Sequence, residues 1–188
     1  MRHSADHTLL RQKATIAQIH GYCYGGHHEL ALVCDIAIAS EDARLTHPGY
    51  CYIGPLGSIV LFMHTVGVRK VKEMVLTGTP LNAQEALDCG LINRMVPLDK
   101  LEEEMDKVAQ TIAQQPFDAI VIGKANFEVA LDIMGVTAGQ SAGYIGRSLQ
   151  TNIRYEPGEF NLFREKINKG VKAAMHERNT RYDSKLFE

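Results

Sequence analysis

The 188-residue sequence has no tryptophan, no long apolar run and no strong excess of either charge. Without an apolar run of about 20 residues it predicts no transmembrane helix. Its net charge of −2 gives no general attraction to nucleic acid. The N-terminal residues lack the apolar core of a signal peptide. Four cysteines without CxxC or zinc-finger spacing favour reduced thiols in a cytoplasmic protein.

The most informative stretch is a glycine turn between two short apolar segments, residues 15–20 and 36–39. The pattern predicts a strand, a turn, a helix and a second strand. Gly25 and Gly26 let the backbone approach a ligand closely. The amides that open the following helix suit an anion, or an oxygen that becomes negative during a reaction. Glu29 lies about one turn into this helix, close enough to act on the same ligand.

The run from Thr15 to Asp35 resembles the signature of the enoyl-CoA hydratase/isomerase (crotonase) superfamily. That signature combines an I-A-x-I-x-G strand, a G-G-x-x-E-L turn and a C-D pair before the next strand. The resemblance implies an α/β, crotonase-like (ClpP/crotonase) spiral of ββα units with a C-terminal helical region. It also implies an acyl-CoA substrate whose thioester oxygen meets the Gly26 N–H, with Glu29 as acid/base. Coenzyme A is then part of the substrate, and no separate cofactor is expected.

Two parts of the family pattern are missing. Where the family has a second catalytic acid after a proline, this sequence has Gly49, followed by Tyr50 and Tyr52. A tyrosine or His47 could replace the lost acid, or these side chains could simply pack the loop. An F-x-A-G-x-D-like turn, which supplies the first oxyanion N–H in the family, occurs nowhere in the chain. The chain is therefore expected to lack the opening part of the fold.

His27 and His28 stand where the family has small residues. We expect His27 to shape the acyl pocket and His28 to face a packing partner. Adjacent side chains do not face one another on a helix, and no further Cys, His or carboxylate completes a cluster. No metal site is predicted.

Later patterns concern the scaffold. Helices are expected to begin at Ser58 and to span residues 68–77. Asn82 and Glu85 form a predicted capping box. A second capping box is expected from Asp99 and Glu102, before the helical part of the chain. After Pro157-Gly158, the apolar spacing predicts one last helix.

These patterns divide the chain into an N-terminal arm (1–14), an α/β core (15–97) and a C-terminal helical assembly region (98–188). The last contains Phe163-Arg164-Glu165-Lys166, similar to the family's F-x-E-K. The resemblance implies that this region forms a homotrimer or hexamer and helps to close the CoA site. Lys166 is the best candidate for a CoA phosphate, and a solvated basic helix face is the alternative.

Three functions remain open at this point. The first is an enoyl-CoA hydratase or isomerase, in fatty acid or aromatic acid degradation, that uses one oxyanion N–H and Glu29. The second is a hydrolase of the same family that uses His47 or a tyrosine in place of the second acid. The third is a non-catalytic protein that keeps the fold. Hydration divides its proton transfers between two carboxylates, so Gly49 weakens that chemistry and a single Glu29 suits isomerisation.

Overall fold

The computed structural model describes residues 12–47, 57–150 and 152–182. Two three-stranded sheets form its centre. The first sheet is all parallel, in the order β1 (Ile16–Ile19), β3 (Ile36–Ser40), β6 (Arg94–Val96). In the second sheet β2 (Tyr22–Tyr24) is parallel to β4 (Arg44–Thr46), which pairs antiparallel with β5 (Leu81–Asn82).

The chain alternates between the two sheets. After β1, Gly21 turns the chain into β2 with φ at 57°, a conformation that glycine adopts at little cost. Helix α2 (Gly26–Leu32) follows, and β3 and β4 then repeat the step from one sheet to the other. The predicted strand–turn–helix–strand unit is confirmed, with β1 and β3 parallel. Strand β2 was not predicted, because three residues are too few to show a strand pattern.

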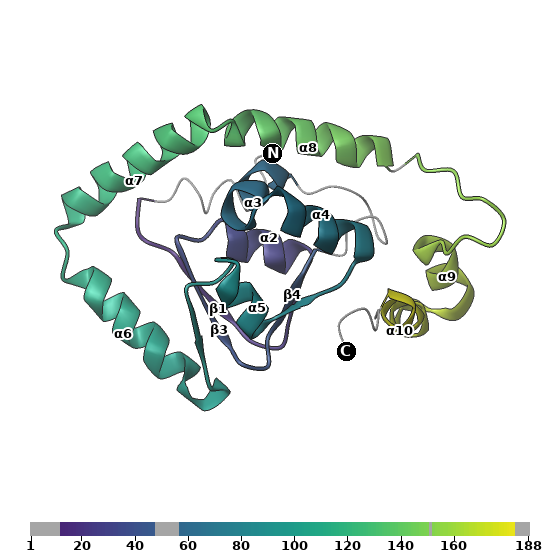
Figure 1. Cartoon of the computed structure of the whole chain (residues 1–188), viewed down its shortest axis with the longest axis horizontal. Coiled ribbons are helices and arrows are strands. Elements are labelled where there is room, and N and C mark those ends of the chain that lie inside the picture. The colour runs from purple at the N-terminus through teal and green to yellow at the C-terminus, as the bar shows by residue number, and fades with distance from the viewer. Residues whose placement is uncertain (1–11, 48–56, 151, 183–188) are drawn as a thin grey trace.

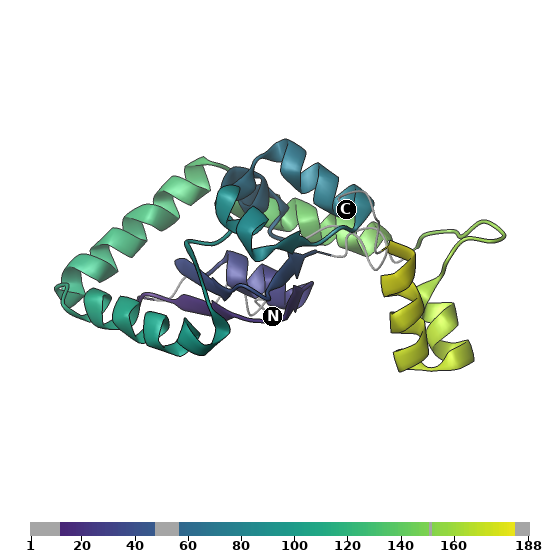
Figure 2. The same cartoon turned by 60° about the horizontal axis from the view of Figure 1, so that its bottom comes forward.

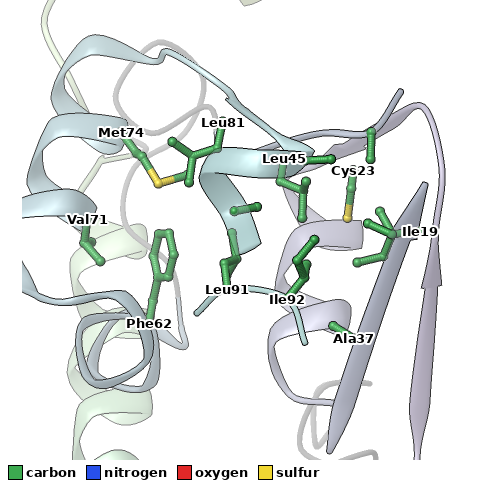
Figure 3. Close-up of a cluster of buried hydrophobic side chains, with 14 of the residues drawn as sticks. Ile19, Cys23, Ala37, Leu45, Phe62, Val71, Met74, Leu81, Leu91 and Ile92 are labelled. Carbon is green, nitrogen blue, oxygen red and sulfur yellow. The ribbon is translucent and has the colours of Figure 1, made fainter. Parts of the chain in front are cut away.

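A continuous core joins both sheets to three helices: α3 (Ile59–Val66), α4 (Val68–Thr77) and α5 (Ala83–Asp88). In Figure 3 Ile19 and Ala37 of the first sheet approach Cys23 and Leu45 of the second, and the helices supply Phe62, Val71 and Met74 on the other side. All of these side chains are buried. Burial of a large apolar side chain contributes about 1.5–3 kcal/mol, so this core holds the two sheets together.

The expected capping box at α5 is present. The Asn82 side chain accepts from the Glu85 amide at 2.9 Å, and the Glu85 carboxylate accepts from the Asn82 amide at 2.8 Å. The second expected box is wrong. A 3-10 turn, η2 (Leu98–Lys100), leads into the next helix, and Lys100 occupies the cap position without a side-chain bond. Asp99 is thereby drawn into the turn instead of capping the helix.

Helices α6 (Leu101–Ala113), α7 (Phe117–Ile133) and α8 (Val136–Gln150) form an arc around the sheets, as Figure 1 shows. Helices α9 (Leu162–Lys169) and α10 (Val171–Tyr182) pair as a hairpin that lies apart from the sheets in Figures 1 and 2. The predicted single last helix is thus two helices, because Gly170 takes φ 83° between them. Among the described helices, none combines the length and apolarity needed to cross a bilayer.

Helix α8 packs very closely on α3. A Cβ placed on Gly139 would lie 2.2 Å from Cγ2 of Val60, so no side chain fits there. Gly143, one turn further along, is also buried. The small residues on this face of α8 set the distance between the two helices.

An ion pair ties α7 to the turn before β3. Lys124 is 8% exposed, and its Nζ lies 2.7 and 2.6 Å from the two carboxylate oxygens of Asp35. The same carboxylate accepts from the amide and the hydroxyl of Thr15 at 2.6 and 2.7 Å. Asp35 therefore joins the start of β1, the end of the α2 segment and α7.

We expect Lys124→Met to destabilise the protein by about 2 kcal/mol. Removing one partner of a buried pair costs more than this, but the Asp35 side chain is about one-third exposed, so water compensates part of the loss. Urea denaturation measures the change. Lys107→Met, which removes an exposed partner of Glu103, is the matched control and should cost under about 0.5 kcal/mol. Equal losses in the two variants would contradict the structural role of Asp35.

Candidate functional site

The predicted site lies at the start of α2. Gly25 has φ 59° and ψ −117°, and its amide donates to the Thr46 carbonyl of β4 at 3.1 Å. This left-handed conformation, which favours glycine, directs the chain from β2 into the helix. Gly26 begins the helix, so its N–H has no partner one turn earlier in α2. A Cβ on Gly26 would meet nothing within 4 Å, which leaves open space around this residue.

Glu29 lies in the first turn of α2 and is only 6% exposed. Its Oε1 accepts a hydrogen bond from the Gly57 amide at 3.2 Å. The positive end of the helix dipole also favours a carboxylate in this turn. The structure therefore places Glu29 and Gly26 within one helical turn and directs the carboxylate toward the segment before α3.

His28 is a packing residue, as expected. It is 1% exposed, and its ring meets the Phe62 ring edge-to-face at a centroid distance of 4.7 Å. Within the described part of the chain, neither ring nitrogen has a hydrogen-bond partner. Burial, and then the nearby charge of His47, lower the pKa of His28 from 6.5 to about 3. The imidazole is therefore neutral at pH 7.

His47 follows β4 and is also held neutral. Burial lowers its pKa from 6.5 to about 4, with a further contribution from the positive charge of Arg147 on α8. A neutral imidazole can accept a proton, but it is not a ready proton donor at pH 7. The other loop candidates, Gly49, Tyr50 and Tyr52, lie outside the described residues.

His27 faces the opposite side of α2 from Glu29. With Leu30 and Cys34 of the α2 segment it lines a cavity of about 520 Å³ that extends along β1 and β2. The cavity therefore borders the glycine turn, while the buried carboxylate points into the other face. Lys166 lies on α9, with its Nζ 5.6 Å from the centre of the Phe163 ring. The hairpin that carries it lies apart from α2 in both views, so the described chain does not bring Lys166 to the turn (Figures 1 and 2).

Two groups at the site were missed by sequence reasoning. Gly57 supplies the amide to Glu29, and Tyr144 of α8 lies directly against Gly57. The only local signal was a glycine just before an apolar helix, and nothing near Tyr144 marks it as part of a site. Within the described residues, no three His, Cys, Asp or Glu side chains gather in a way that could hold a metal ion.

Comparisons with known proteins identify this fold and motif. A family model described as enoyl-CoA hydratase/isomerase matches residues 5–152. The mitochondrial enoyl-CoA hydratase of Pongo abelii is 34% identical over 131 residues, 68% of this chain and 45% of that protein. The short-chain-enoyl-CoA hydratase of Clostridioides difficile is 41% identical over 105 residues, 55% of this chain and 67% of that protein.

Solved structures agree. An enoyl-CoA hydratase from Mycobacterium smegmatis superposes with a TM-score of 0.82 at 23% identity, over 94% of this chain and 60% of that chain. An enoyl-CoA hydratase/isomerase from Xanthobacter autotrophicus superposes with a TM-score of 0.78 at 29% identity, over 94% of this chain and 67% of that chain. The predicted crotonase-like α/β fold is confirmed, and the chain belongs to the enoyl-CoA hydratase/isomerase family. It spans about half the length of the first curated relatives it matches.

The lowered pKa values of the buried His28 and the half-buried His47 predict acid sensitivity. Each has a folded-state pKa below the unfolded value of about 6.5, so the unfolded chain binds more protons in acid. Stability is complete above pH 6.5 and falls as the pH drops toward about 3 for His28, by up to about 1.4 kcal/mol per pH unit. We expect His28→Leu to reduce the slope of the unfolding free energy against pH between pH 6 and pH 4. The reduction should correspond to about one proton fewer taken up on unfolding.

Urea titrations at each pH measure this slope. His20→Gln is the control, because His20 is exposed. An unchanged slope in His28→Leu would contradict the neutral, buried state of His28.

Proposed function

We propose that the chain acts on an enoyl-CoA thioester, with the Gly26 amide toward the thioester oxygen and Glu29 as the proton carrier. The observation that carries this proposal is the placement of both groups in the first turn of α2, with the carboxylate buried and held by an amide. The family match supports this substrate class. Coenzyme A would be part of the substrate, and the mechanism calls for no other cofactor.

The chemistry is a proton shift next to a thioester. In isomerisation Glu29 takes a proton from the α-carbon of a β,γ-enoyl thioester, and negative charge develops on the thioester oxygen. The Gly26 N–H and the helix dipole stabilise that charge, and one such donor lowers a barrier by about 3 kcal/mol. Glu29 then returns the proton to the γ-carbon, so the double bond moves and no atom is lost or gained.

Hydration makes a stronger demand on the site. Water adds to the β-carbon while a proton is delivered to the α-carbon, which calls for a base and an acid at once. Glu29 is one such group, and Gly49 occupies the family position of the other. A single carboxylate that removes a proton and then returns it favours isomerisation over hydration in this chain.

A second candidate, hydrolysis of the thioester, draws support from His47. Its lowered pKa leaves a neutral imidazole at pH 7 that can take a proton from an attacking water. Product analysis separates the reactions, since hydrolysis releases free CoA thiol and isomerisation does not.

We also propose that copies of the chain assemble into a trimer or hexamer through α7. Ile122, Val129 and Ile133 are spaced along one face of this helix, and Ile133 is 82% exposed in the single chain. Exposed apolar faces of this kind mark contact surfaces. The cysteine pattern favours a cytoplasmic location, whereas several relatives are named as mitochondrial. The proposed pathway is fatty acid or aromatic acid degradation, as the family resemblance implies.

We expect Glu29→Gln to lower kcat by at least about 100-fold, because the amide cannot carry the proton. Spectrophotometry of enoyl-CoA substrates measures turnover. The variant should still bind acyl-CoA, since its shape is kept. A ligand at about 100 times its dissociation constant stabilises the fold by about 2.7 kcal/mol, visible in thermal unfolding. Glu41→Gln, at an exposed position after β3, is the control. Full turnover in Glu29→Gln overturns the proposed role.

We expect the double variant Ile122→Lys/Ile133→Lys to dissociate the assembly. Two buried charges in an apolar contact have no partner and carry a large desolvation cost. Light scattering on a sizing column gives the mass. Leu76→Lys, at an exposed position of α4, is the matched control and should leave the mass unchanged. An assembly that persists in the double variant contradicts the α7 contact.

A further inference from the structure

Gly57 has no room for a side chain. A Cβ placed on it would lie 3.0 Å from two ring carbons of Tyr144 and 3.2 Å from the phenolic oxygen. Gly57 does not have a positive φ. Glycine is therefore required here by the lack of room for a side chain and not by the backbone conformation. The tip of the Tyr144 ring therefore rests against the Cα of Gly57, on the side that a side chain would occupy.

The same Cα carries the amide that bonds to the catalytic candidate. The Gly57 N–H donates to Glu29 Oε1 at 3.2 Å, at the long end of the usual range. A displacement of Gly57 by a few tenths of an ångström away from Glu29 would break this bond. The contact with Tyr144 and the bond to Glu29 are thus parts of one chain of contacts.

Helix α8 holds Tyr144 firmly in that place. Val136, at its start, is buried in a cluster with Val33 and Leu61. Gly139 is fixed against Val60 of α3 by the close approach described above. Since α3 begins two residues after Gly57, α8 is anchored to the helix that continues the Gly57 segment.

We propose that Tyr144 is a positioning residue: its ring holds Gly57 in place, and Gly57 in turn aims the carboxylate of Glu29. The catalytic consequence rests on the proposed function, whereas the positioning itself does not. Tyr144 is half-buried and lies 87 positions after Gly57, in the helical region that the family motif does not include. Tyr144 thus adds a residue from the arc of helices α6, α7 and α8 to the described groups around Glu29.

Four single variants and one double variant separate this role from ordinary packing. Tyr144→Phe keeps the ring and removes only the hydroxyl. Tyr144→Ala removes the ring that supports Gly57. Tyr144→Leu also removes the ring but keeps more side-chain volume, and it replaces the alanine variant if that variant folds poorly. Gly57→Ala pushes against the ring from the other side. In the double variant Gly57→Ala/Tyr144→Ala the new methyl group occupies space that the ring has left, so the two changes should compensate.

The first measurement is the NMR shift of the Gly57 amide in protein labelled with 15N-glycine, which needs no turnover. Glu29→Gln gives the reference for the amide without a charged acceptor. We expect Tyr144→Ala or Tyr144→Leu to move the Gly57 signal toward that reference, and Tyr144→Phe to leave it in place. A Gly57 signal that is unchanged in Tyr144→Ala and Tyr144→Leu overturns the proposal.

The second measurement is the pH dependence of kcat/KM. We expect Tyr144→Ala and Gly57→Ala each to lower kcat by about tenfold or more, with little change in KM. The acid limb should move to higher pH, because losing the amide donor disfavours the charged carboxylate. The double variant should recover toward wild type. If Tyr144→Phe loses as much as Tyr144→Ala, the hydroxyl is the active group and positioning by the ring is wrong. If the wild type turns over no enoyl thioester, the proposed function fails while the amide shift still decides the positioning.

Discussion

A carboxylate that folding takes out of water needs a hydrogen-bond donor in exchange, and the geometry of this site follows from that need at Glu29. The glycine turn starts α2 at the residue that brings Glu29 into the first turn, where the helix dipole favours a negative charge. The Gly57 amide supplies the bond, so the segment before α3 has to lie close to α2. Helix α8 then closes on α3 and on Gly57. One buried charge thus connects the motif to parts of the chain far from it.

The two faces of α2 divide its chemistry. His28 and Glu29 point into the protein, while His27 and Leu30 border the cavity along β1. His28, the residue before Glu29, and His47, after β4, are both uncharged at neutral pH, because burial disfavours the imidazolium form.

Local patterns in the sequence were sufficient for some features and not for others. The Asn82 capping box was predictable because all its atoms lie within four residues, and the Gly26–Glu29 turn because one motif contains it. The bond from Gly57 to Glu29 spans 28 residues, and no periodicity signals a contact at that distance. Tyr144 depends on how α8 lies over α3, which only tertiary packing decides. The division of the last helix at Gly170 was missed because the apolar spacing continues across it, and Lys166 matched a motif without lying near the turn.

The close contact between α3 and α8 limits which substitutions the protein can tolerate. At Gly139 the fit depends on a side chain being absent, since even a methyl group would overlap Val60. Every replacement of a glycine codon that changes the amino acid introduces at least that methyl group, whichever residue results. The position thus has no conservative alternative, unlike a buried leucine, for which isoleucine or methionine preserve most of the volume. Natural variation along α8 should therefore be concentrated on its outer face, and Gly139 should be among the least variable positions in sequences that keep this packing.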